Sequence, residues 1–379
     1  MNEWKKVRFL DVVHLNPRIS LEKGVEYPFV EMSNVVPCAR KPEKDVFKKY
    51  LGGGTKFEQG DTIVARIEPC LQNGKGFQCS YKQGFGSTEF IVFRPVNIND
   101  LDCDFLYYYM GQQAIREAMA KTMVGASGRQ RVNNKVFNDL QINLPPLSTQ
   151  HRIATILSRY DSLIENYQKQ IKLLEEAAQR LYKEWFIDLH FPEHENTNII
   201  DGVPEGWEKK KVGEVIAKVP RSKQIPTKDY QNEGAIPIID QSRNYIAGYT
   251  DDMESKVESN EPYIVFGDHT RVLKYVPFPF AKGADGTQLI MSNNLDLMPQ
   301  CLLFTSLVSV DLSNYSYARH FKYLKEEEIL VPTASIANAF SKHVAKWYAK
   351  IQLNREQLRF LTEARDRLLP KLMSGEITV

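Results

Sequence analysis

The feature that most constrains this chain is a long amphipathic segment that occurs twice. In the first copy, apolar residues recur at alternating steps of four and three, which is the pattern of a coiled-coil seam. The seam positions are Ile153, Leu157, Tyr160, Ile164, Tyr167, Ile171, Leu174, Ala178, Leu181 and Trp185. Adding 187 to each position, without a gap, gives Phe340, Val344, Trp347, Ile351, Asn354, Leu358, Leu361, Arg365, Leu368 and Leu372, of which eight are apolar. We therefore predict two copies of one helix.

Both segments carry signals for their ends and for their register. The first is predicted to run from Ser148 to Phe186, which is about 58 Å at 1.5 Å per residue. Gly375 follows the second copy and is the residue type that caps helix C-termini. Asn354 and Arg365 interrupt the second seam, and a polar residue inside a coiled coil fixes register at a cost in stability. We predict that Asn354 sets how the two helices pair.

The repetition extends beyond the helices. WKKVRFLDVV (4–13) matches WEKKKVGEVI (207–216), TEFI (88–91) matches TQLI (287–290), and Leu144-Pro145 matches Val331-Pro332 before each helix. The offset shrinks from 203 through 199 to 187, as loop-length differences between two diverged copies would produce. The chain is therefore predicted to be globule, long helix, globule, long helix.

Each globule alternates short apolar runs with Gly, Asn and Pro clusters, which predicts strands between turns. Predicted strands are 62–67, 76–81 and 89–93 in the first globule, with a helix at 104–120, and 263–267, 271–276 and 288–291 in the second. The polar, aperiodic stretch PEHENTNIIDGVPEG is predicted to link the halves. The predicted boundaries are 1–146 for the first globule, 147–190 for the first helix, 191–206 for the linker, 207–332 for the second globule and 333–379 for the second helix. The fold class is α+β.

This organisation predicts a geometry. The first helix leads away from the first globule, the short linker is followed by the second globule, and the second helix most simply runs back along the first. The expected fold is two pseudo-symmetric globules separated by an antiparallel coiled coil. A pseudo-twofold axis matches the symmetry of a DNA backbone, which dimeric DNA readers exploit. Since the globules differ in sequence, they would read two different half-sites.

Composition narrows the function classes. With 42% hydrophobic and 25% charged residues, the chain has an ordinary globular composition, and no apolar run approaches the roughly 18 residues of a spanning helix. Five cysteines without a CxxC pair predict reduced thiols, with neither disulfides nor structural zinc, in a cytoplasmic protein. The net charge of +2 is low for a stand-alone nonspecific DNA binder. If DNA is bound, a partner is expected to supply positive charge.

Sequence motifs of catalysis are missing. The nearest approach to the [DN]PP[YF] motif of adenine methyltransferases is NEPY (260–263), in which Glu261 replaces the first Pro. The Gly-rich GGGTK (52–56) lacks the residue order of a phosphate-binding loop, and Gly267-Asp268-His269 has no second His nearby. We predict turns or loops at both places, and no catalytic or metal-binding residues.

Several segments resemble a known family. LPPLSTQHRIATIL (144–157), which leads into the first helix, and RDRLLPKLMSGEI (365–377), which ends the second, are similar to the specificity subunits of type I restriction-modification enzymes. So are GDTIVARIEPCLQNGKG (60–76), GSTEFIVFRP (86–95), GASGRQRV (125–132), VFGDHTRVLKYVPFPF (265–280) and GADGTQLI (283–290). The similarity covers nearly the whole chain. Thr149 departs from the pattern, which has Glu at this position.

The resemblance implies a non-catalytic subunit that reads double-stranded DNA. Each globule would be a target recognition domain for one half of a bipartite target, and the helices would set the gap and dock the modification subunits. Such subunits bind two modification subunits, which carry S-adenosylmethionine, and restriction subunits, which use ATP and Mg. No cofactor is expected in this chain itself.

For DNA contacts we favour polar and basic residues on Gly-rich loops, whose paired donors suit base edges and phosphates. The candidates in the first globule are Arg66, Asn73, Lys75, Arg129, Gln130 and Arg131. Those in the second are Arg243, Asn244, His269, Thr270, Arg271, Lys274, Lys282, Arg319 and His320. Two alternatives stay open: a scaffold protein that does not bind DNA, and the specificity subunit of a related single-complex restriction enzyme.

Overall fold

The chain folds into two compact units. The computed structural model describes residues 4–126, 128–315 and 319–379, so Ser127 of the predicted loop 125–132 lies outside the described residues. Unit 1 comprises Met1–Asn166 with Leu358–Val379, and unit 2 comprises Tyr167–Gln357. Both units contain helices and sheets, which confirms the predicted α+β class. None of the helices formed by the described residues has the length and apolar character required to cross a membrane.

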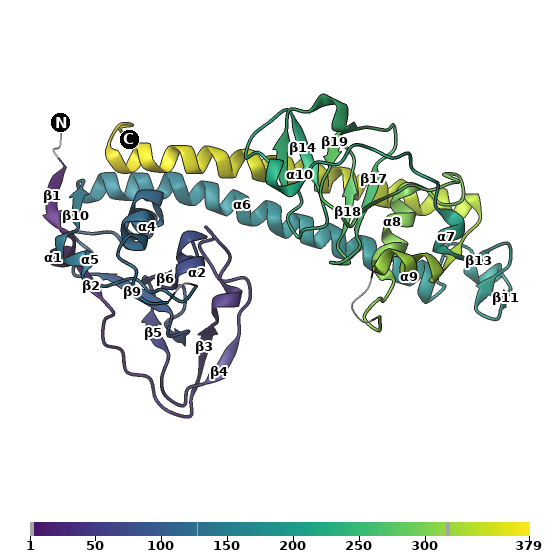
Figure 1. Cartoon of the computed structure of the whole chain (residues 1–379). Coiled ribbons are helices and arrows are strands. Elements are labelled where there is room, and N and C mark those ends of the chain that lie inside the picture. Colours follow the sequence, from purple (N-terminus) through teal and green to yellow (C-terminus); the bar gives the residue numbers. More distant parts are fainter. Residues whose placement is uncertain (1–3, 127, 316–318) are drawn as a thin grey trace. The chain divides into compact units, whose positions relative to one another are not determined.

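Unit 1 contains two four-stranded sheets and one strand pair (Figure 1). Its elements are β1 (Lys5–Arg8), α1 (Phe9–Val12), β2 (Val13–Leu15), β3 (Glu26–Val30), β4 (Phe47–Lys49), β5 (Thr55–Glu58), β6 (Thr62–Ala65), α2 (Glu68–Gln72), β7 (Gly76–Gln78), β8 (Gln83–Gly86), β9 (Phe90–Pro95), α3 (Cys103–Gly111), α4 (Gln113–Ala120), α5 (Val136–Asp139), β10 (Gln141–Leu144) and the first part of α6 (Leu147–Tyr182). The strand orders are β4-β3-β8-β5, β2-β9-β6-β7 and β1-β10. The three strands predicted in this half are present as β6, β7 and β9.

The single helix predicted at 104–120 is wrong in one respect, because it is divided into α3 and α4. Gln112 adopts extended backbone angles, φ −65° and ψ 140°, which ends α3 and precedes α4. Gly111 is a poor helix former, and its carbonyl accepts a hydrogen bond from the Arg116 guanidinium instead of from a helical N–H. The break turns the chain at the point where a continuous helix was expected.

Unit 2 repeats this organisation. Its elements are β11 (Ile199–Ile200), β12 (Val203–Pro204), β13 (Glu208–Lys211), α7 (Val212–Val215), β14 (Ile236–Ile239), β15 (Gly248–Thr250), β16 (Lys256–Val257), β17 (Tyr263–Gly267), β18 (Leu273–Val276), β19 (Phe280–Lys282), β20 (Thr287–Ile290), α8 (Gln300–Ser309), α9 (His320–Glu326), β21 (Glu328–Val331) and the first part of α10 (Ala334–Ser374). The strand orders are β15-β14-β19-β16, β18-β17-β20, β13-β21 and β11-β12. The three strands predicted in this half are present as β17, β18 and β20.

The stretch predicted to be aperiodic, 192–206, contains the small hairpin β11-β12. Asp201 and Gly202 at its turn have φ values of 51° and 74°. Two successive left-handed residues form the type I′ turn that Asp-Gly favours, because this turn matches the twist of paired strands. The Asp-Gly pair between two Ile residues and Val203 was the signal for it in the sequence.

The internal repeat is confirmed by strand register. β1 and α1 correspond to β13 and α7 at an offset of 203, and β10 corresponds to β21 at an offset of 187. The pairing of Lys5 with Leu144 becomes that of Glu208 with Val331 at the same offsets. Both units also contain a four-stranded sheet with one central parallel pair, β3-β8 in unit 1 and β14-β19 in unit 2. The two halves therefore share these pairings, although the sheet β2-β9-β6-β7 of unit 1 corresponds to the three-stranded sheet β18-β17-β20 in unit 2.

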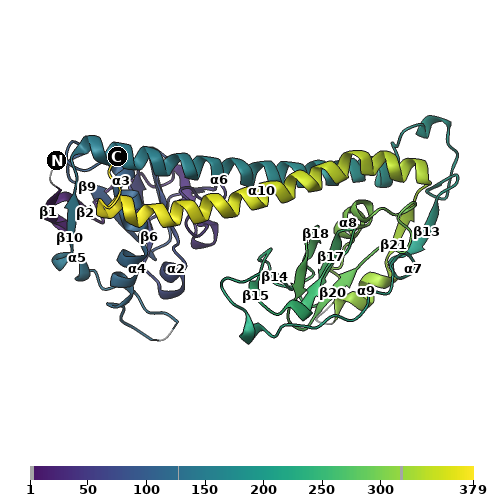
Figure 2. The ribbon, with the colours of Figure 1, turned by 90° about the horizontal axis from the view of Figure 1, so that it is seen from above.

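The long helices contribute the seam that the heptads predict. In unit 1 the start of α6 and the end of α10 lie side by side (Figures 1 and 2), and Leu157 and Leu372 are both in the core. In unit 2 Tyr182 contacts Phe340 while Gln170 contacts Asn354, so the two helices run antiparallel. Ten seam residues are buried: Ile153, Leu157, Ile164, Ala178, Phe340, Val344, Ile351, Asn354, Arg365 and Leu372. The other ten are half-buried: Tyr160, Tyr167, Ile171, Leu174, Leu181, Trp185, Trp347, Leu358, Leu361 and Leu368.

The two polar seam residues have partners on the facing helix. The Asn354 side chain is fully buried, and its Nδ2 donates to Oε1 of Gln170 at 3.2 Å. The Arg365 guanidinium is 2.8 Å from the buried carboxylate of Asp161, which also accepts a hydrogen bond of 2.5 Å from the Tyr108 hydroxyl. Gly375, at the end of α10, has φ 78° and serves as the predicted C-cap. Each unit therefore has its own polar pair in the seam.

The Arg365–Asp161 pair generates a stability prediction. Changing Arg365 to Ala leaves the Asp161 carboxylate buried without its cation, which we expect to lower the free energy of unfolding by about 3–5 kcal/mol. Replacing both residues by apolar ones, Asp161→Leu with Arg365→Met, should cost less than the single change, because no buried charge is left unpaired. Urea unfolding compares the variants, with amide hydrogen exchange at 157–166 to assign the loss to unit 1. A double variant less stable than Arg365→Ala would contradict this account.

Candidate nucleic-acid interface

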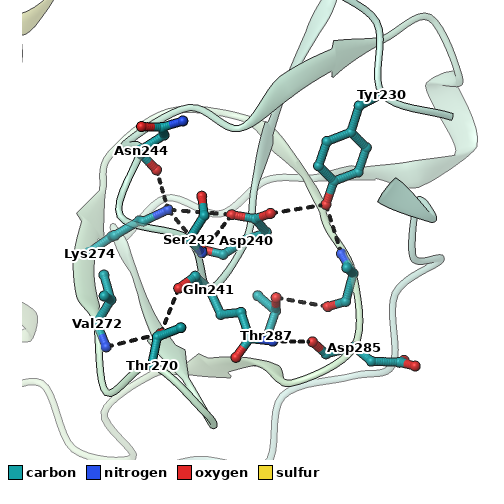
Figure 3. A network of polar contacts seen from close by, with 11 residues as sticks. Tyr230, Asp240, Gln241, Ser242, Asn244, Thr270, Val272, Lys274, Asp285 and Thr287 are labelled. Carbon is teal, nitrogen blue, oxygen red and sulfur yellow. Dashed lines mark hydrogen bonds and ion pairs between the residues drawn. The ribbon is translucent and has the colours of Figure 1, made fainter. Parts of the chain in front are cut away.

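Three loops of unit 2 are joined by one network of hydrogen bonds (Figure 3). They are residues 240–244 after β14, 268–272 between β17 and β18, and 283–286 between β19 and β20. Gln241 is the common member. Its Nε2 donates to the Asp285 carbonyl at 2.8 Å, and its own carbonyl accepts from the Thr270 hydroxyl at 2.6 Å. Its Oε1 accepts from the His269 N–H at 3.1 Å, so one side chain with its carbonyl connects all three loops.

Lys274 lies beneath this surface. Its side chain is only 4% exposed, and its Nζ donates to the carbonyls of Asp240 at 2.7 Å and of Asn244 at 2.5 Å. The Asp240 carboxylate is 3.8 Å from Nζ and accepts hydrogen bonds from the Ser242 N–H and the Tyr230 hydroxyl. Burial lowers the pKa of Lys274 to about 8. The buried ammonium group therefore joins the two ends of the 240–244 loop (Figure 3).

Four predicted contact residues are exposed on these loops, namely Arg243, Asn244, His269 and Thr270. Among the described residues, Arg243 has no carboxylate within salt-bridge distance. A guanidinium that is exposed and uncompensated is available to a phosphate or a base edge. These four residues form the part of the prediction that the structure brings together at the surface.

The other predicted residues of unit 2 lie deeper or to one side. Arg271 and Lys282 are half-buried; Arg271 donates to the Tyr315 carbonyl at 2.9 Å, and burial lowers the pKa of Lys282. His320 is buried, with Nδ1 2.9 Å from the Asp268 carbonyl. Arg319 is exposed beside it at the start of α9. His320, like Lys274, is therefore turned into the unit and away from solvent.

In unit 1 the predicted loop 125–132 runs beside the end of β6. The Val132 N–H donates to the Arg66 carbonyl at 2.9 Å, and the Glu68 N–H donates to the Gln130 carbonyl at 2.9 Å. Arg131 binds Glu89 through both carboxylate oxygens, with Nη2 to Oε1 at 2.6 Å and Nε to Oε2 at 2.8 Å. These hydrogen bonds lower the pKa of Glu89. The arginine thus ties the loop to the start of β9.

The remaining candidates of unit 1 surround this contact. Asn73 and Arg129 are exposed, while Arg66, Lys75 and Gln130 are half-buried. The Nζ of Lys75 donates to the Met32 carbonyl at 2.8 Å, in the segment that follows β3. Gln130 donates from its side chain to the Gly125 carbonyl at 3.4 Å. Among the described residues, the exposed side chains of Asn73 and Arg129 make no hydrogen bond or ion pair, so these two can face a ligand.

Sequence reasoning missed the residues that organise the loops. Gln241, Asp240, Tyr230 and Glu89 were not among the candidates, yet each holds a loop or one of its basic residues in place. For Gln241 a signal was present, because the apolar strand IPII is followed at once by the polar run DQSRN. Side chains of this kind satisfy backbone groups where a strand ends. Nothing local pointed to Glu89, whose partner Arg131 lies 42 residues away.

The buried position of Lys274 generates a pH prediction. Because its pKa is about 8 in the folded chain and ordinarily 10.5, the unfolded chain binds more protons at this side chain between these values. The free energy of unfolding therefore gains from Lys274 as pH rises from 8 to 10.5. We expect the stability of the wild-type chain relative to Lys274→Met, measured by urea unfolding at each pH, to increase through this window. A constant difference would contradict the buried position of this amine.

Comparisons with known proteins agree on one family. The family described as "Type I restriction modification DNA specificity domain" matches residues 1–176. The MjaIX specificity subunit of a type I restriction enzyme from Methanocaldococcus jannaschii is 28% identical over 304 residues, which cover 73% of this chain and 69% of that protein. The HindI specificity subunit from Haemophilus influenzae is 22% identical over the full length of both chains. The crystal structure of a type I restriction-modification S subunit from M. genitalium aligns with a TM-score of 0.62 at 17% identity, over 97% of this chain and 96% of that one.

Proposed function

Because the chain is similar to type I restriction enzyme specificity subunits, with 28% identity to one of them over 73% of its length, we propose that it is the sequence-specific DNA-binding subunit of a type I restriction-modification complex. Unit 1 reads one half of a bipartite DNA target, here called half-site 1, and unit 2 reads half-site 2. The observation that carries the proposal is that one framework, repeated with the same strand register, bears two different loop surfaces. A repeated framework with unlike loops suits two unlike half-sites.

The exposed loop residues are suited to DNA. Arg129 in unit 1 and Arg243 in unit 2 offer guanidinium groups to phosphates or guanine edges, and Asn73 and Asn244 offer amides of the kind that pair with adenine. The loop that bears Arg129 is ordered by the bonds from Arg131 to Glu89, and the loop that bears Arg243 and Asn244 is ordered by the bonds from Gln241 to its neighbours. Ordered loops lower the entropy lost on binding, which favours specific recognition over general attraction.

The chemistry belongs to partner subunits in this proposal. The chain itself is non-catalytic and holds no cofactor; two modification subunits supply S-adenosylmethionine for methyl transfer, and restriction subunits supply the ATP- and Mg-dependent steps. The long helices set the gap between half-sites and dock the modification subunits. A net charge of +2 is small for a DNA binder, so these partners also contribute cationic surface to the complex. Its DNA target places the complex in the cytoplasm.

A direct test is to co-express the chain with the modification subunit encoded beside it and to map methylated adenines in the host genome by single-molecule sequencing. We expect a bipartite motif, with two unlike half-sites at a fixed gap. The motif should be lost when the chain is omitted and the modification subunit is retained. A stable complex without bipartite methylation, and without sequence-specific DNA binding in a direct assay, would reject the proposal.

Arginine variants test the assignment of unit 1 to half-site 1. Arg129→Ala removes an exposed cation and should lower the slope of log K against log salt by about one. Arg131→Ala also uncovers the Glu89 carboxylate, so we expect about tenfold weaker binding than for Arg129→Ala, since like charges oppose each other. Gel-shift titration with the modification subunit present measures both variants, and Glu89→Gln combined with Arg131→Ala should recover part of the loss.

The same titration contains its own control. Preference at half-site 2 should be unchanged in all these variants, because none of the substituted residues lies in unit 2. Equal loss of preference at both half-sites would show that the arginines act on the whole complex, and the assignment to half-site 1 would be wrong.

A further inference from the structure

Lys75 and Lys274 occupy equivalent positions in the two units. In unit 1 Val64 of β6 pairs with Ile91 on one side and with Gly76 on the other. In unit 2 Ile264 of β17 pairs in the same way with Ile290 and with Tyr275. Ile91 and Ile290 are the matching residues of the repeated TEFI and TQLI segments. By strand register, Lys75, which precedes Gly76, is therefore the equivalent in unit 1 of Lys274, which precedes Tyr275 in unit 2.

Both lysines make the same kind of contact. Lys75 donates from Nζ to the carbonyl of Met32, two residues beyond the end of β3. Lys274 donates to the carbonyl of Asp240, the first residue beyond the end of β14, and to that of Asn244. β3 and β14 are themselves equivalent, since each forms the parallel pair of its sheet. In both units, therefore, a lysine at the equivalent position holds the segment that follows the equivalent strand, β3 in unit 1 and β14 in unit 2.

The donors of Lys274 are already used within the unit and are not available to DNA. An ammonium group has three donors and no acceptor, and Lys274 uses two of them on loop carbonyls while a third direction faces the Asp240 carboxylate at 3.8 Å. Its side chain is nearly inaccessible, whereas Arg243 and Asn244 on the loop that it holds are exposed. The lysine orders the backbone, and its neighbours present the side chains.

We propose that Lys75 and Lys274 are positioning residues. Each fixes the segment that follows the parallel-paired strand of its unit, at Met32 in unit 1 and at 240–244 in unit 2, and thereby sets base preference at one half-site without touching DNA. The proposal rests on the DNA-reading function proposed above. It replaces the direct contact predicted for both lysines from the sequence. Because the clamp acts from inside the unit, its loss changes which bases are preferred and leaves the number of phosphate contacts unchanged.

The experiment compares Lys274→Met with Arg243→Met in the complex with the modification subunit. Binding is measured to the cognate target and to targets with single base changes in either half-site, at several salt concentrations. For Lys274→Met we expect discrimination within half-site 2 to fall by about tenfold or more, near the cost of one mismatched base pair, with half-site 1 and the salt slope unchanged. For Arg243→Met, an exposed cation on the same loop, we expect uniformly weaker binding and a salt slope lower by about one.

Lys75→Met is compared in unit 1 with Arg129→Met, an exposed cation on the 125–132 loop, with the half-sites exchanged. Lys75 is half-buried and makes one such bond, so its variant is the milder one and decides the matter if Lys274→Met destabilises unit 2. Amide hydrogen exchange gives a second readout: in Lys274→Met, faster exchange should be confined to the 240–245 loop. Normal exchange in β17 and α8 shows that the unit is still folded.

The outcomes separate the possibilities. A lysine variant that keeps its base preference but lowers the salt slope by about one is a direct phosphate contact, and the positioning role is then overturned. A variant with neither effect overturns it as well. If the wild-type complex itself shows no bipartite preference, the failure lies in the proposed function, and the wild-type control in the same assay reveals that first.

Discussion

Burial of the seam between α6 and α10 is the constraint on which both units depend. In unit 1 the core takes Leu157 from α6 and Leu372 from α10, and in unit 2 it takes Ala178 and Phe340. A fully buried Leu or Phe side chain contributes about 1.5–3 kcal/mol, so the inner faces of the sheets are stabilised by the helices that cover them. Each unit also has a smaller cluster between its own strands, which includes Phe57 and Phe77 in unit 1 and Val265 and Phe280 in unit 2. The long helices therefore cover one sheet of each unit, and the second sheet packs on the first.

Because these seam residues contact one another, the two copies differ at several contacting positions at once. In unit 1 the seam contains Asp161 and Arg365, with Tyr108 of α3 bound to the carboxylate. At the repeat offset of 187, Tyr348 and Ala178 stand in unit 2 at the places of Asp161 and Arg365, and the Tyr348 hydroxyl lies 3.1 Å from that of Thr305 in α8. Changing Asp161 alone would leave the Tyr108 hydroxyl without this acceptor, and changing Arg365 alone would leave the buried carboxylate without its cation, which is costly. Residues in contact couple energetically, and the two copies differ here in a set of contacts.

The sequence predicts features that depend on neighbouring residues, and it does not predict contacts between residues that are distant along the chain. Periodicity is local, and it predicted the seam, the repeat, and strands such as 263–267 at their observed places. It predicted one helix across Gln112 and no hairpin at 199–204, where a weak helix former and an Asp-Gly turn decided the backbone. Periodicity could not predict in which direction a long side chain points. Lys75 and Lys274 reach carbonyls that are 43 and 34 residues away, and a basic residue in a Gly-rich loop gives no local sign of this.

The loop network of unit 2 separates two tasks that the proposed recognition surface must perform. Lys274, Gln241 and Asp240 bind mainly backbone groups, so they hold the loops whatever side chains the neighbouring positions carry. Among the described residues, the exposed side chains of Arg243 and Asn244 do not hold another loop in place. Because satisfied buried polar groups give rigidity while exposed ones give contact, the proposed surface divides into a buried frame that orients the loops and exposed side chains that can touch DNA. The two units, alike in register and unlike at the loop surface, are two results of that division within one chain.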